Sequence, residues 1–140
     1  RLLQGVRHPH TGFMLDTGHL MNTNLALADE QAAADYVTSV YRSLGEMGKY
    51  VRGLHLHCSL SGAYTKRMIQ EHAGEHRPLT WHESMRYIMQ VDWHHPFQTE
   101  AVRQIVDTVQ PDYIVHEFIQ RSHDDWEQKV HTQRHALGWE

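Results

Sequence analysis

The sequence predicts an α/β fold, a parallel sheet covered by helices, and two observations support this class. Apolar segments of strand length alternate with segments whose apolar residues recur at helical spacing. Strands that alternate with helices are typically parallel and joined by helical crossovers. The 140 residues, 1–140, suffice for a single domain, and because the first residue is Arg1 rather than Met we expect a fragment of a longer protein.

Three apolar segments are predicted as strands, and each ends in or near a side chain that can bind a metal ion. The segments are residues 12–19, 51–57 and 113–118. Asp16 lies in the first, His55 in the second and Glu117 in the third. Side chains alternate between the two faces of a strand, so His57 shares a face with His55. In parallel sheets, sites form where the carboxyl ends of the strands meet, which is where we expect these side chains.

Helices are predicted between and after these strands from their capping residues and apolar spacing. The expected helices begin at Asp29, Thr99 and Ser122 and end near Gly48, Pro111 and Gly138. Residues 62–90 form a long insertion with two short helical stretches, the second opened by a capping box of Thr80 and Glu83. His116 should point away from the site toward a helix, where it would need a polar partner.

Composition limits the classes of function. The chain has 13 Lys and Arg against 17 Asp and Glu, a net charge of -4, so it lacks the basic character of a general nucleic-acid binder. Its 14 histidines are scattered, and many would gain a proton below about pH 6.5. The one cysteine, Cys58, cannot form an internal disulfide, which fits a reducing compartment, and we expect a cytoplasmic protein. No apolar run is long enough to span a membrane.

The candidate metal ligands are carboxylates and imidazoles, which suit zinc, manganese or iron. Asp16, His55 and Glu117 end apolar strands, where an unpaired charge is costly, although Asp16 could instead cap the next segment. Asp92 and His94 lie in a loop, where a solvated surface pair is the alternative to a metal pair. For His57, a structural or substrate-facing role is favoured over ligation. A closed structural zinc site is disfavoured because no cysteine cluster is present.

Four motifs in order resemble the xylose-isomerase-like TIM barrels, a superfamily that includes endonuclease IV and many sugar isomerases and epimerases. The motifs are Asp16-Thr17-Gly18-His19, Arg52-Gly53-Leu54-His55-Leu56, Asp92-x-His94-His95 and a strand that ends in Glu117. The resemblance covers nearly the whole chain. It implies the C-terminal portion of a TIM barrel, about three of its eight parallel βα units.

The same resemblance implies roles for single residues. Asp16, His55 and Glu117 would bind a central divalent metal, with zinc or manganese favoured and magnesium, cobalt or iron as alternatives. In the endonuclease IV pattern, His19, Asp92 and His94 would bind a further metal. In the sugar-enzyme pattern, His19 would contact substrate and Glu117 would double as a catalytic acid/base.

Three functions follow as hypotheses. The favoured one is a metal-dependent isomerase or epimerase of a sugar or sugar phosphate, with a small carbohydrate as substrate. The alternatives are a metal-dependent phosphodiesterase acting on abasic DNA, disfavoured by the acidic balance, and a non-catalytic metal-binding or assembly fragment. Three strand–helix units would leave open sheet edges, so self-association or pairing with a missing N-terminal half is expected.

Overall fold

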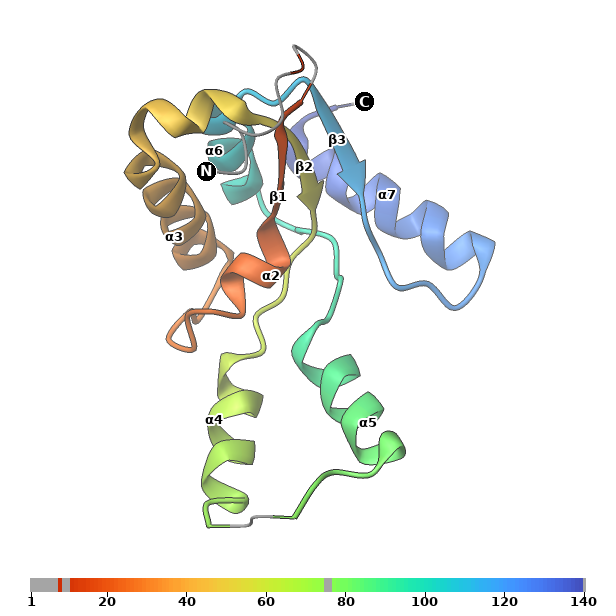
Figure 1. Cartoon of the computed structure of the whole chain (residues 1–140). Helices are drawn as coiled ribbons and strands as arrows, with labels where there is room; N and C mark the ends of the chain where they lie inside the picture. The colour runs from red at the N-terminus through yellow and green to blue at the C-terminus, as the bar shows by residue number, and fades with distance from the viewer. Residues whose placement is uncertain (1–7, 9–10, 75–76, 140) are drawn as a thin grey trace.

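The computed structural model describes residue 8 and residues 11–74 and 77–139. Within them, one sheet has three parallel strands in the order β1-β2-β3 (Figure 1). The strands are β1 (Phe13–Asp16), β2 (Val51–Leu56) and β3 (Tyr113–His116). The predicted α/β class with parallel strands is therefore confirmed.

The strand register separates a buried face of the sheet from an open one. Three rows of paired residues cross it: Met14, Gly53 and Tyr113; Leu15, Leu54 and Ile114; and Asp16, His55 and Val115. Because side chains alternate, the first and third rows share one face. Leu54 is completely buried, whereas Met14 is 38% and Tyr113 52% exposed. The face that carries Asp16 and His55 is therefore the open one.

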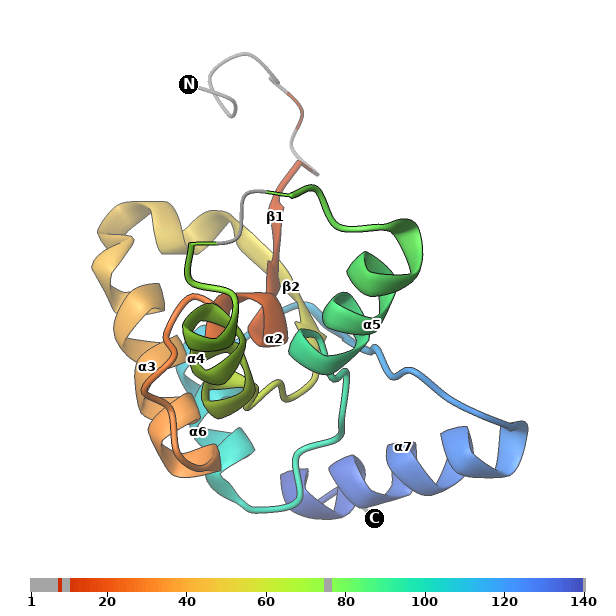
Figure 2. The ribbon, with the colours of Figure 1, turned by 90° about the horizontal axis from the view of Figure 1, so that it is seen from below.

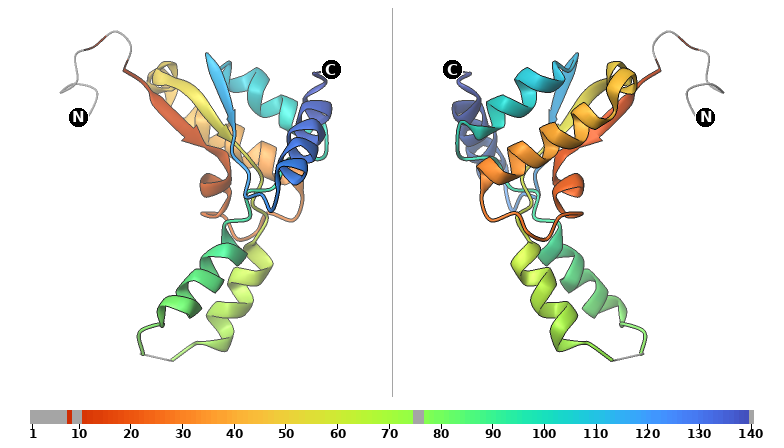
Figure 3. Two further views of the ribbon diagram at one scale, coloured as in Figure 1. Left: turned by 90° about the vertical axis from the view of Figure 1, so that its right-hand side faces the viewer. Right: turned by 90° about the vertical axis from the view of Figure 1, so that its left-hand side faces the viewer.

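Three helices cover the other face: α3 (Glu30–Ser43), α6 (Ala101–Val109) and α7 (His123–Leu137). They lie on one side of the sheet in both views of Figure 3, and Figure 2 shows them from below. Their apolar residues form the core with the buried strand residues, and the members include Val37, Leu54, Leu56, Val102, Ile105 and Leu137. The predicted helices are confirmed, and a 3-10 helix, η1 (Gly45–Tyr50), leads from α3 into β2.

The first apolar segment does not stay a strand as far as predicted. Strand β1 ends at Asp16, and a short helix, α2 (Thr17–Met21), begins at the next residue. The Asp16 side chain accepts a hydrogen bond from the backbone N–H of His19 at 2.9 Å, which caps this helix. His19 is therefore carried by a helix, one turn beyond the sheet.

The insertion between β2 and α6 holds two helices, α4 (Gly62–Glu71) and α5 (Trp81–Val91), as predicted. Both project away from the sheet in Figures 1 and 3. Thr80 and Glu83 form the predicted capping box at the start of α5. Among the described residues, no helix is both long enough and apolar enough to cross a membrane.

The partner that His116 was expected to need is Gln133 of α7. The Gln133 amide nitrogen lies 2.8 Å from Nδ1 of His116 and also donates to the Leu56 carbonyl at 2.9 Å. Its amide oxygen accepts from the backbone N–H of Phe97 at 3.0 Å. One completely buried side chain thus connects α7 to two strands and to the segment before α6.

Candidate metal centre

Seven potential ligands converge beyond the carboxyl ends of the strands, and among the described residues they form three overlapping groups. In each group the candidate ligand atoms lie within 4.8 Å of one another. The groups are Asp16, His55 and Glu117; His19, Asp92 and His94; and His57, His94 and Glu117. All six side chains predicted from the sequence as ligands lie in these groups, and His57 is an additional member.

The first group sits at the edge of the open face. Asp16 and His55 are paired across β1 and β2, and Glu117 directly follows β3. Nδ1 of His55 lies 2.9 Å from Oε2 of Glu117 and 3.6 Å from Oδ2 of Asp16. Each of these side chains is partly exposed, so a small molecule can reach them from solvent.

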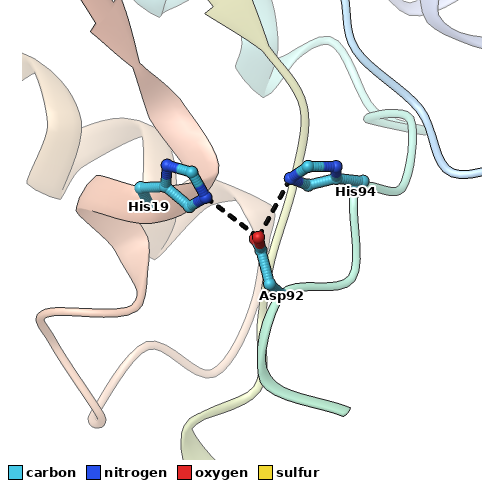
Figure 4. Close-up of side chains that lie close together, drawn as sticks. All are labelled: His19, Asp92 and His94. Carbon is cyan, nitrogen blue, oxygen red and sulfur yellow. Dashed lines mark hydrogen bonds and ion pairs between the residues drawn. The ribbon is translucent and has the colours of Figure 1, made fainter. Parts of the chain in front are cut away.

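The second group is assembled from helix α2 and the segment that follows α5 (Figure 4). Oδ2 of Asp92 lies 2.9 Å from Nε2 of His19 and 3.1 Å from Nε2 of His94. Asp92 caps the carboxyl end of α5, and His94 has a φ of 47°, a left-handed conformation that is uncommon for a residue with a side chain. The Asp92 and His94 side chains are 21% and 15% exposed, so this pair is partly buried and not fully solvated.

His57 lies between the two groups. Its Nε2 is 3.0 Å from Oδ1 of Asp16 and 3.9 Å from Oε2 of Glu117, and its ring centroid is 4.0 Å from that of His94. The side chain is 0% exposed, so the substrate-facing role suggested by the sequence is wrong. The alternation of His55 and His57 placed both on one face, but nothing in the sequence showed how deeply His57 is buried.

Several close contacts in the cluster are not hydrogen bonds. Oε2 of Glu117 and Nε2 of His94 are buried and have no hydrogen-bond partner, although each has a polar neighbour at 2.9 or 3.1 Å. Buried polar atoms are normally satisfied, so a water molecule or an ion is expected to complete the surroundings of these two atoms. A divalent cation fits this set of nitrogen and oxygen atoms, and these groups could hold one.

The electrostatics favour the protonation states that metal ligands need. Burial would raise the pKa of Asp16, but hydrogen bonds from His57 and from the His19 backbone, with the charges of both histidines, lower it to about 2. Burial and the charge of His57 lower the pKa of His94. Near neutral pH, Asp16 is therefore anionic and His94 is neutral, as metal binding requires.

His19 differs from His94. Burial opposes its protonation, but the hydrogen bond with Asp92 and the charges of Asp16 and Asp92 raise its pKa. A cation at the second group would therefore have to displace a proton that is held more firmly than usual.

No protein-family model, curated protein or solved structure compared with the chain matches it.

Proposed function

We propose that this chain is the metal-binding portion of a divalent-metal-dependent sugar isomerase or epimerase. The proposal rests on one observation: Asp16, His55 and Glu117 converge at the carboxyl edge of a parallel sheet, on the face that the helices leave open. Zinc or manganese suits these ligands best, with magnesium, cobalt or iron as alternatives. The fold that fits is the last three βα units of a xylose-isomerase-like TIM barrel, whose sites lie at this end of the strands.

The residues then have separate roles. A bound divalent cation would hold two oxygens of the sugar and polarise its carbonyl group. Glu117, whose side chain is partly exposed, moves a proton between substrate carbons or oxygens as the acid/base. His19, whose side chain is 58% exposed, contacts the substrate from α2.

The charges around the site favour a carbohydrate over a polyanion. The ion-pair partners of Asp16, Asp92 and Glu117 among the described residues are all histidines, with no Lys or Arg. The chain as a whole carries a charge of -4. A nucleic-acid backbone is normally bound through a basic surface, and these charges oppose it.

The second group supports an alternative function. His19, Asp92 and His94 could hold a further cation close to the first group. Clustered divalent ions are typical of phosphodiester hydrolysis, so a phosphodiesterase acting on abasic DNA is the second candidate. A non-catalytic metal-binding fragment is the third.

The experiment uses the protein that contains this chain, loaded with zinc or manganese. In deuterated water, it should exchange a carbon-bound proton of an aldose or ketose, as followed by NMR, and Glu117→Gln should abolish the exchange. His95→Gln is the matched control, because His95 lies beside His94 but belongs to none of the three groups.

The same preparation is tested with an abasic-site duplex. Cleavage of this duplex, with binding that weakens steeply as salt rises, would favour the phosphodiesterase. Neither activity in a complete, metal-loaded protein would leave the non-catalytic function.

A further inference from the structure

The two oxygens of Asp16 have different surroundings. Oδ1 accepts hydrogen bonds from Nε2 of His57 at 3.0 Å and from the backbone N–H of His19 at 2.9 Å. Oδ2 instead faces other candidate ligands, with Nδ1 of His19 at 3.1 Å and Nδ1 of His55 at 3.6 Å. Oδ1 is thus engaged within the fold, and Oδ2 is the oxygen available to a cation.

His57 is fixed from several sides. Its backbone N–H donates to Oγ1 of Thr17 at 3.1 Å, and its carbonyl accepts from the same hydroxyl at 2.6 Å. Its ring lies against Gly18, and the side chain is completely buried. A ring held in this way can fix the orientation of the Asp16 carboxylate to which it is hydrogen-bonded.

Alignment distinguishes His57 from its neighbours. The contact between Nε2 of His57 and Oδ1 of Asp16 has hydrogen-bond geometry. An ionised carboxylate can only accept, so Nε2 must be the donor in this bond. The contacts of His55 with Glu117 and of His94 with Asp92 are equally close but leave Oε2 of Glu117 and Nε2 of His94 without a hydrogen bond. The other ring nitrogen of His57, Nδ1, is also buried without a hydrogen-bond partner, but it lies against Gly18. Nε2, the nitrogen that faces the candidate ligands, is engaged with the Asp16 carboxylate.

We propose that His57 is a positioning residue that holds Oδ1 of Asp16 so that Oδ2 faces the metal. The inference rests on the proposed metal centre and adds a residue to it. Partners that hydrogen-bond a ligating carboxylate fix its orientation, and their loss weakens metal binding by about 10–100-fold. The competing assignment, in which His57 itself binds metal with His94 and Glu117, is an outcome of the test.

The first measurement is zinc affinity, by competition with a chromophoric chelator, for the wild type and three variants. His57→Leu removes the donor and should weaken binding about 10–100-fold. His57→Gln keeps an N–H group near the position of Nε2 and should recover most of that loss. His95→Gln should bind zinc as the wild type does. Unchanged affinity in His57→Leu, or no recovery in His57→Gln, would overturn the proposal.

The second measurement is the nitrogen NMR spectrum of the His57 ring. In the metal-free protein, Nε2 should be protonated and Nδ1 bare, and zinc should leave this pattern in place. A bare Nε2, or a zinc-induced shift typical of direct coordination, would overturn the positioning role. If the wild type binds no zinc stoichiometrically, the metal centre itself fails, while the metal-free spectrum still tests the bond between His57 and Asp16.

Discussion

A Cβ atom on Gly18 would lie 2.1 Å from Cε1 of His57, so the imidazole occupies the space that any larger residue at position 18 would need. Gly18 lies in helix α2, where alanine would normally be favoured by about 1 kcal/mol. The glycine is therefore explained by the ring beside it and not by the helix. It allows a buried histidine to lie against the first turn after β1.

Gly18→Ala should lower the free energy of unfolding by about 1–3 kcal/mol, because overpacking beside a fixed ring forces both groups to move. Urea denaturation measures this change. In the double variant Gly18→Ala, His57→Ala, the added methyl group no longer meets the ring, so the two changes should not be additive. Additive losses would show that the two residues are not coupled.

Replacing both His55 and Glu117 with alanine should remove the tightly bound metal, because two members of the first group are lost. Metal content is measured by elemental analysis after a chelator wash, which strips ions from surface histidines. Equal metal content in the variant and the wild type would contradict the site.

The acid stability of the metal-free protein should depend on Asp16. Its pKa falls from the ordinary value of 3.8 to about 2 on folding, so ionised Asp16 contributes its full stabilisation at pH values above 3.8. This stabilisation is lost as the pH falls from 3.8 toward about 2, because the unfolded chain then binds a proton at Asp16 more readily than the folded protein does. Asp16→Asn can still cap α2 but cannot titrate, so the difference in unfolding free energy between wild type and variant should shrink toward pH 2. A constant difference would contradict this account.

Gln133→Leu should cost several kcal/mol, since it leaves the backbone N–H of Phe97 and the carbonyl of Leu56 without this buried partner. Each such loss costs about 1–3 kcal/mol. Gln128→Leu, at an exposed position of the same helix, is the matched control and should change stability little. Thermal melts of the two variants make the comparison, and equal effects would contradict the importance of the buried amide.

Much of the fold could be predicted because its signals are local. The alternation in the strand segments, the cap at Asp29 and the capping box at Thr80 and Glu83 correspond to elements of the structure. The convergence of Asp16 and His55 also followed from a local pattern, since parallel strands bring their carboxyl ends to one edge.

The remainder depends on contacts between distant segments. The sequence placed His19 at the end of a strand, but the capping bond from its N–H to Asp16 turns the chain into α2. The burial of His57 depends on Thr17 and Gly18, which pack against it across a long sequence separation. No periodicity in the sequence indicates such a contact, so the sequence favoured a structural or substrate-facing role for His57 but could not predict its burial or its bond to Asp16.

The last prediction concerns assembly through the open face of the sheet. Met14, Tyr113 and Val115 are 38%, 52% and 39% exposed there beside the candidate metal centre, and burying the rest of each would contribute about 1 kcal/mol. We expect the 140-residue chain to self-associate through this face, and Val115→Lys should shift it toward the 16.4 kDa monomer.

Trp81→Lys is the control, because Trp81 is highly exposed but lies on the projecting helix α5. Light scattering with intact-mass analysis measures both variants. A wild type that is already a monodisperse monomer would contradict self-association, and a monomer produced only by Trp81→Lys would assign it to the helices of the insertion.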